Sequence, residues 1–193
     1  MALRRGETHI APIHLLDEKT GEYNISSIQK YLKGNDIKLL KAVQRVQGLM
    51  LPKGNPKGIG SIEDLATKDV IFINRQKGSG TRVFLDFMLS KENVESEKIT
   101  GYDREMTTHM MVASAIQSGT ADVGMGIESV ANLMGLDFIP IGVEHYDFAV
   151  TEAVVGTEIF DNFVDVLKSE ELKKKITELG GYVLDGIGEL SNV

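Results

Sequence analysis

The chain has 193 residues, of which 42% are hydrophobic and 25% are charged, so it can bury a full core without disulfides or a structural metal. Its formal net charge of −7 argues against a nucleic-acid surface, because phosphate binding needs a clustered excess of Lys and Arg. The absence of cysteine excludes disulfides and thiolate metal sites, and no apolar stretch reaches the roughly 18 residues of a membrane span. Since MALRRGETHI lacks the apolar core of a signal peptide, we expect a cytoplasmic protein unless a leader was removed.

The first fifty residues are expected to form strands with one helix between them. The segment HIAPIHLL, residues 9–16, is short, apolar and followed by the turn-rich DEKTGEYN, which favours a buried strand. A helix should begin near Ser26 or Ser27 and end before Gly34-Asn35. Residues 37–51 predict a long strand or a pair of strands, with a helix over their first half as the alternative.

The turn-rich segment PKGNPKGIGSIEDL is interpreted as a passage from a first lobe to a second one. Within it, Ser61 is expected to cap a short helix over residues 62–65. A strand at 70–73 and a helix at about 81–90 should follow. The apolar residues of that helix that share a predicted core-facing stripe are Val83, Phe84, Phe87 and Met88.

The remainder of the second lobe alternates between helix and strand patterns. MTTHMMVASAIQSG predicts a helix that ends at Gly119, ADVGMGIES a strand with a turn, and SVANLMGL a short helix. DFIPIGV and HYDFAV predict two further strands. This alternation is typical of the α/β class with a doubly wound, mainly parallel sheet.

The last forty residues differ, because they contain two amphipathic helices, around 159–167 and 172–179, and no evident strand. Thr157 and Ser169 are the expected N-caps, and Gly180-Gly181 should stop the second helix. We expect these helices to return to the first lobe. The predicted domains are therefore 1–49 with 148–193, and 50–147.

The loop NRQKGSGTR stands where a strand turns into a helix, and helix N-termini bind anions through unpaired N–H groups and a partial positive charge. Glycine allows a ligand to approach the backbone, while hydroxyl and guanidinium groups add donors. The predicted anion-binding residues of this loop are Arg75, Gly78, Ser79, Gly80, Thr81 and Arg82. The alternative is a glycine-rich turn with Ser79 as a plain N-cap. The spacing matches neither a Walker A loop nor a nucleophile elbow.

Further candidates lie at other strand ends and helix starts. Thr108 and His109 in GYDREMTTH could bring a second helix N-terminus to the same site, although Asp103 or Thr107 could simply cap that helix. For Glu105, an ion pair with Arg104 is the favoured role. The remaining candidate ligand-binding residues are Gly124, Gly126, His14 and Tyr146, and packing is the alternative for the two glycines. His9 and His14 lie five apart on a strand, so they face opposite sides and predict no metal pair.

Six segments in order along the chain resemble one known family, the periplasmic-binding-protein-like domains of the molybdate-binding type. They are RRGETHIAPIHLLDEKTGEYN, QGLMLPKGNPKGI, NRQKGSGTR, GYDREMTTH, SGTADVGMGIES and LDFIPIGVEHYDFAV, and the pair NRQKGSGTR with GYDRE is the most specific. Such domains occur fused behind the molybdopterin biosynthesis protein MoeA or behind helix-turn-helix regulators, and they are related to LysR substrate-binding domains. The spacing of Arg75, Ser79, Gly80 and Thr81 also resembles the oxyanion loop of phosphate- and tungstate-binding proteins.

The resemblance implies a two-lobed type II periplasmic-binding-protein-like fold that closes on a ligand, with hinge strands near 47–50 and 146–150. Members of the family normally start earlier, with a strand and a turn bearing Ser or Asp, so the first lobe is expected to lack its N-terminal strand. The function implied is non-catalytic binding of molybdate, tungstate, another oxyanion or an anion related to the molybdenum cofactor. No other cofactor, no metal and no membrane or nucleic-acid partner is expected, and fusion to another domain or a homodimer stays open.

Two other functions remain as alternatives. The first is an interaction domain whose cleft is vestigial. The second, less favoured, is a hydrolase that uses Ser79 with His109, for which no motif supplies a third catalytic partner.

Overall fold

The computed structural model describes residues 2–34 and 36–193, and the chain divides into two compact units. Unit 1 combines the segment that ends at Arg45 with Glu144–Val193, and unit 2 is the uninterrupted segment Val46–Val143. The boundaries expected from the sequence lie after residues 49 and 147. Across the part of the chain that the structure describes, none of the helices combines the length and hydrophobicity of a transmembrane segment.

Two strands of 15 residues, β2 (Ile37–Leu51) and β6 (Asp137–Thr151), each contribute to both units. The expected strand at 37–51 is confirmed as a single element, and its helical alternative is wrong. The two strands predicted from DFIPIGV and HYDFAV are one continuous strand, because neither Gly142 nor the charged Glu144 interrupts the extended backbone between them.

Unit 1 is built around the first half of β2 and the second half of β6. β1 (Ile10–Ile13) pairs antiparallel with β6, and α1 (Ile25–Tyr31) follows it, starting next to Ser26 as predicted. The other unit 1 elements are η1 (Leu3–Arg5), η3 (Glu152–Val154), α6 (Glu158–Lys168), α7 (Glu170–Leu179), β7 (Tyr182–Val183) and β8 (Leu190–Asn192). β7 and β8 pair with β2, so the expectation that the last forty residues contain no strand is wrong. Both strands are too short for an alternating pattern to show.

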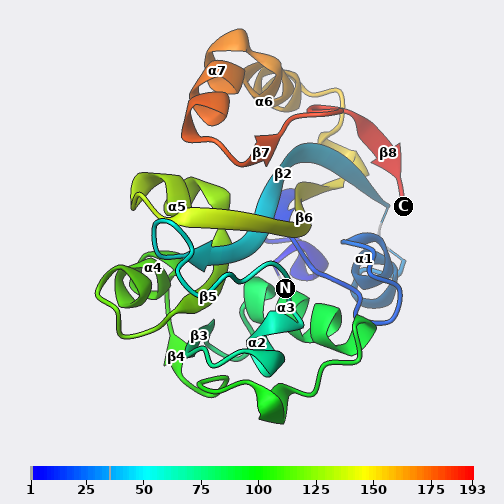
Figure 1. The fold of residues 1–193 in the computed structure, drawn as a ribbon. Coiled ribbons are helices and arrows are strands. Elements are labelled where there is room, and N and C mark those ends of the chain that lie inside the picture. The colour runs from blue at the N-terminus through cyan, green and yellow to red at the C-terminus, as the bar shows by residue number, and fades with distance from the viewer. Residues whose placement is uncertain (1, 35) are drawn as a thin grey trace. The chain divides into compact units, whose positions relative to one another are not determined.

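The ends of α6 and α7 follow the sequence closely. Thr157 accepts a hydrogen bond from the Phe160 amide (3.4 Å) and Ser169 from the Leu172 amide (3.3 Å), which confirms both N-caps. Gly180 and Gly181 have φ values of 71° and 72°, which L-residues rarely adopt, and they end α7 as predicted. The two helices lie together in Figure 1. Their apolar faces pack on a core with Leu40, Val150, Phe160, Leu167 and Ile187 at its centre.

Unit 2 contains the parallel part of the sheet. β3 (Phe72–Arg75) lies between β4 (Glu105–Met106) and β5 (Val123–Ile127) and runs parallel to both, while β2 pairs antiparallel with β5. The helices of this unit are α2 (Asp64–Thr67), α3 (Gly80–Lys91), η2 (Ser96–Lys98), α4 (His109–Gln117) and α5 (Glu128–Leu133). Within this unit, α4 and α5 lie on one side of the strands and α3 on the other (Figure 1). The α/β class is confirmed, and the parallel pairing of this unit joins these three short strands.

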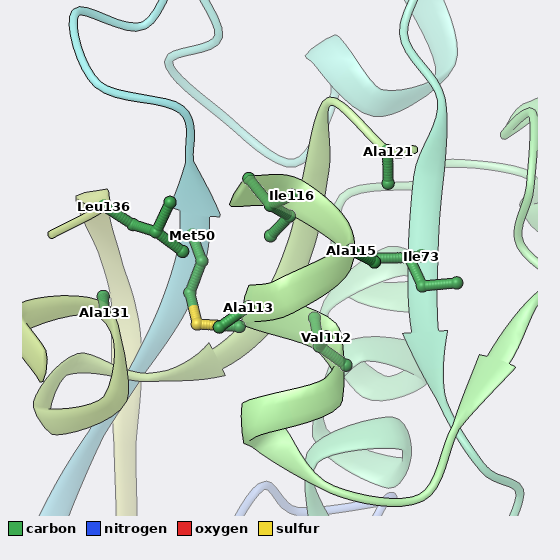
Figure 2. Close-up of a cluster of buried hydrophobic side chains, with 9 residues drawn as sticks. All are labelled: Met50, Ile73, Val112, Ala113, Ala115, Ile116, Ala121, Ala131 and Leu136. Atoms are coloured by element: carbon green, nitrogen blue, oxygen red, sulfur yellow. The ribbon is translucent and has the colours of Figure 1, made fainter. Parts of the chain in front are cut away.

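The core on the α4 side is densely packed. Val112, Ala113 and Ile116 of α4 lie between Met50 of β2 and Ile73 of β3 (Figure 2). Each of the larger of these side chains contributes about 1.5–3 kcal/mol by leaving water. This packing fixes where α4 begins relative to β3, and hence where Thr108 and His109 lie.

Two local predictions for unit 2 need correction. Ser61 does not cap a helix at residue 62, because α2 starts at Asp64, whose carboxylate accepts the backbone N–H groups of Gly60 (2.6 Å) and Ser61 (3.2 Å). In α3 the buried apolar side chains are Phe84, Leu85 and Leu89, whereas Val83, Phe87 and Met88 are only partly buried. The core-facing stripe is therefore rotated toward Leu85.

Candidate functional site

The carboxyl ends of β3, β4 and β5 meet at one edge of unit 2, because the three strands run parallel. α3 follows β3 after a four-residue connection, and α4 follows β4 after a two-residue connection. Their N-cap residues, Ser79 and Thr108, therefore lie at this same edge. We call this region the strand edge.

Both N-caps use their side chains in the same way. Ser79 Oγ accepts a hydrogen bond from the Arg82 amide (3.2 Å), and Thr108 Oγ1 accepts one from the Met111 amide (3.1 Å). The capping role suggested for Ser79 is thus real. For α4, the cap is Thr108, so the alternative caps Asp103 and Thr107 are wrong.

Capping does not exhaust these hydroxyl groups, since each has one proton to donate as well as lone pairs that accept. In unit 1, the caps Thr157 and Ser169 donate that proton to the carbonyls of Val154 (2.7 Å) and Val166 (2.8 Å). Among residues 2–34 and 36–193, no acceptor receives the proton of Ser79 or Thr108. These two hydroxyls can therefore donate to a ligand while they cap.

The first backbone amides of α3 add further donors. The first i to i−4 bond of this helix joins the Val83 amide to the Ser79 carbonyl (3.0 Å). The amides of Gly80 and Thr81 precede it in the first turn, where the helix offers no carbonyl. Together with the positive end of the helix dipole, they form an arrangement that suits an oxyanion.

Hydrogen bonds hold the loop before α3 against the loop before α4. Arg75 Nη2 donates to the Thr107 carbonyl (3.0 Å), and the Gln76 amide donates to the Met106 carbonyl (3.1 Å). The backbone amide of Lys77 donates to the Glu105 carboxylate (3.2 Å). The predicted ligand residue Arg75 is thus tied to the backbone that leads into α4, and one loop amide, that of Lys77, is already satisfied by the protein.

Arg82 was a predicted ligand residue, and the structure assigns it a different role. Its guanidinium is buried, lies 4.0 Å from the ring centroid of Tyr102, and pairs with Asp86 (3.2 Å) and Glu105 (3.5 Å). The Tyr102 hydroxyl donates to Asp86 (2.6 Å), and burial raises the pKa of Tyr102. These contacts join NRQKGSGTR to GYDRE. They also show that the partner of Glu105 is Arg82 and not Arg104, which donates to the Thr120 carbonyl (3.3 Å).

The glycine candidates fall into two groups. Gly78 is exposed and has a φ of 83°, so the loop needs glycine there to turn into α3. Gly124 is buried, and a Cβ on it would lie 2.5 Å from Val112 and 2.8 Å from Ile73. A Cβ on Gly126 would lie 2.5 Å from Met50 and 3.5 Å from His109 Nδ1. These contacts indicate that position 124 needs glycine for packing. Position 126 is also tightly packed, and it lies beside His109.

The two candidates from unit 1 belong to a polar cluster that sequence reasoning missed. His14 Nδ1 lies 2.8 Å from a carboxylate oxygen of Glu144, and Arg45 binds the other oxygen through Nε (2.9 Å) and Nη2. Tyr146 stacks on His14 (4.9 Å between centroids) and lies 5.0 Å from the guanidinium carbon of Arg45. No local pattern could have found Arg45 and Glu144, because the cluster joins three segments far apart in the sequence.

Glu144 is 1% exposed, and burial by itself pushes its pKa up. The hydrogen bond from His14 and the positive charge of Arg45 outweigh that effect, so the net pKa of Glu144 is lowered. Burial and then the Glu144 charge raise the pKa of nearby Tyr23. Across residues 2–34 and 36–193, no group of three or more His, Asp or Glu side chains is arranged to hold a metal.

The model of a family described as the PBP superfamily domain matches residues 1–168. The chain is 37% identical to the uncharacterized protein YvgK of Bacillus subtilis over 178 residues, which are 92% of this chain. It spans only 57% of the length of YvgK.

Two solved structures share the fold at low sequence identity. A phosphate ABC transporter substrate-binding protein with bound phosphate from Clostridium perfringens superimposes with a TM-score of 0.65 at 15% identity, covering 95% of this chain and 82% of that one. The substrate-binding domain assigned to a molybdenum ABC transporter of Clostridium difficile gives a TM-score of 0.60 at 18% identity, with 94% and 79% covered.

Proposed function

Because this chain belongs to the PBP superfamily domain family, we propose that it is a non-catalytic domain that binds a small oxyanion at the strand edge of unit 2. The proposed contacts are the hydroxyls of Ser79 and Thr108 and the first amides of α3 and α4, at Gly80, Thr81 and His109. Gly78 allows the loop to turn, and Arg75 holds the two loops together and adds positive charge.

One observation supports this function above the others. Each of the two helices that start at the strand edge is capped by a hydroxyl whose proton has no acceptor among the described residues, whereas the hydroxyl caps of α6 and α7 in unit 1 donate theirs. A tetrahedral oxyanion supplies several acceptors in a small volume. Hydrogen bonds from neutral donors to such a charged guest contribute about 1.5–3 kcal/mol each.

The identity of the anion is a narrower proposal. The relatives by fold include one with bound phosphate and one assigned to molybdenum transport, and the motif resemblance favours molybdate or tungstate. Fusion to a MoeA-like or regulatory protein and a cytoplasmic location stay predictions. Contacts of the ligand with His14 and Tyr146 also stay predictions. Within unit 1, His14 Nδ1 already contacts Glu144, and the ring of Tyr146 already stacks on His14.

Thermal unfolding in the presence of anions tests the proposal. A ligand that binds only the folded chain raises its stability by about 2.7 kcal/mol at one hundred times the Kd, so Tm should rise with concentration for the true ligand. Phosphate, molybdate, tungstate and sulfate at equal ionic strength, with chloride as the control, rank the candidates. Equal Tm values for all of them would contradict an oxyanion site.

The same samples test the hydrolase alternative. Ser79 Oγ accepts from the Arg82 amide, and no base among the described residues forms a hydrogen bond with it. We therefore expect no turnover of a chromogenic ester above that of the Ser79→Ala variant. Turnover that disappears in this variant, together with Tm values that no anion changes, would favour the hydrolase. If the chain neither hydrolyses the ester nor changes its Tm with any anion, the remaining alternative is an interaction domain with a vestigial cleft.

A further inference from the structure

Gln47 is a buried polar residue that is not among the proposed oxyanion contacts of the strand edge. Its side chain is 0% exposed, and neither its amide nitrogen nor its amide oxygen has a hydrogen-bond partner among the described residues. Its neighbours on the same face of β2, Leu49 and Leu51, are fully buried and apolar. A leucine at position 47 would avoid the cost of burying an unpaired amide, so the amide points to a partner from outside the chain.

The position of Gln47 connects it to the strand edge. It pairs with Ile127, the last residue of β5, and the end of β5 lies at the same edge as Arg75 at the end of β3. Met50 belongs to the core beside α4 (Figure 2), and side chains alternate along a strand, so Gln47 faces the other side. That side is the one covered by α3, whose first turn provides Ser79, Gly80 and Thr81.

The chemistry of an amide restricts what can satisfy it. The NH₂ group of Gln47 needs an acceptor and its carbonyl oxygen needs a donor. Sulfate, molybdate and tungstate are fully deprotonated near neutral pH and offer acceptors only, so they would leave the carbonyl unpaired. Hydrogen phosphate and hydrogen arsenate keep one O–H group and can satisfy both atoms.

We propose that Gln47 contacts the bound anion and selects a protonated tetrahedral oxyanion, of the hydrogen phosphate type, over fully deprotonated ones. This inference rests on the proposed function of the strand edge and adds the class of its ligand, a phosphate-type anion in place of the molybdate or tungstate that the motif resemblance favours. The Gln47 amide donates to one oxygen of the anion, and its carbonyl accepts the proton of another. Discrimination arises because a guest without an O–H group gains one hydrogen bond but leaves the buried carbonyl unsatisfied.

Calorimetric titration of the whole chain near pH 7 tests this selectivity with phosphate, arsenate, sulfate and molybdate. The wild type should bind phosphate and arsenate more tightly than sulfate and molybdate. Gln47→Leu should weaken phosphate and arsenate binding roughly 10- to 100-fold, as expected for hydrogen bonds to a charged group, while sulfate and molybdate change by less than about threefold. Gln44→Leu, at a half-buried position on the unit 1 part of β2, is the matched control and should change none of the four.

Gln47→Met, which keeps the length of the side chain, replaces the leucine variant if circular dichroism shows that Gln47→Leu is unfolded. If the wild type binds none of the four anions, the proposed function itself fails. If the wild type binds an anion but the Gln47 variants leave the order of affinities unchanged, this inference is overturned and the oxyanion site stands.

Discussion

The polar cluster around Glu144 in unit 1 and the strand edge of unit 2 both gather polar groups, yet they differ in whether those groups are satisfied. Around Glu144, each carboxylate oxygen has a protein partner, supplied by His14 and Arg45, and Tyr146 covers these side chains. At the strand edge, the hydroxyl protons of Ser79 and Thr108 and the amide of Gln47 have no such partner among the described residues. Polar groups that satisfy one another stabilise a fold, whereas groups held in place without partners are suited to a ligand.

The largest expected effect tests the closed character of the Glu144 cluster. Glu144→Gln removes the charge that Arg45 and His14 both contact, and breaking a buried ion pair from one side costs about 3 kcal/mol or more. Urea denaturation should show this loss in the free energy of unfolding. Glu171→Gln, at an exposed carboxylate that pairs with Lys175, should cost less than about 1 kcal/mol. Equal effects of the two substitutions would mean that the cluster is not a stabilising unit.

The next effect separates capping from ligand binding. Ser79→Ala and Ser169→Ala each remove an N-cap, so both should lower the free energy of unfolding by about 1 kcal/mol. Only Ser79→Ala should also weaken anion binding, by about 1.5–3 kcal/mol, because only its hydroxyl proton is available to a ligand. Calorimetry measures the affinity and urea denaturation the stability. An unchanged Kd in Ser79→Ala would remove this hydroxyl from the site.

A smaller effect tests the assignment of Arg82 to the framework. Tyr102→Phe removes the hydroxyl that donates to Asp86 but keeps the ring beneath the Arg82 guanidinium. We expect a loss of about 1 kcal/mol in the free energy of unfolding and less than a twofold change in Kd. Tyr31→Phe, on an exposed ring, is the control. A large loss of affinity in Tyr102→Phe would mean that this framework shapes the anion site directly.

The smallest effect concerns pH. The net pKa of Glu144 is below its ordinary value of 4.5, so its ionised form stabilises the fold above that value. This contribution should be lost as the pH falls from 4.5 through the lower pKa of the folded state. Stability measured by urea denaturation over this range should fall less steeply in Glu144→Gln than in the wild type. Parallel curves for the two proteins would contradict the lowered pKa.

Local features of the fold could be predicted from the sequence because their physical causes are local. Thr157 and Ser169 each precede an amphipathic segment, and Gly119 and Gly180 each follow a helical segment. The N-caps and the helix ends could therefore be predicted from the sequence. The start of α2 was misplaced because Asp64, inside the helix, binds the amides that Ser61 was expected to organise. The strands β7 and β8 were missed because pairing with β2, and not their own pattern, makes them strands.

The candidate site could be predicted only where one segment carries it. The loop from Arg75 to Thr81 could be predicted as a candidate anion-binding loop because the strand, the glycines and the helix start are consecutive in the sequence. Gln47 lies in an ordinary strand pattern, and only its register against Ile127 brings it to the strand edge. Arg45 and Glu144 meet through the pairing of distant segments in the same way, which no spacing rule reveals.

The continuity of unit 2 has a consequence for biosynthesis. The strand-edge residues proposed to hold the anion all lie between Val46 and Val143, in one uninterrupted segment, whereas unit 1 combines the segments before and after it. Synthesis proceeds from the N-terminus at about 5–20 residues per second, and domains generally fold as units. Unit 2, which holds the proposed anion site, can therefore fold on the ribosome before α6 and α7 of unit 1 have been synthesised.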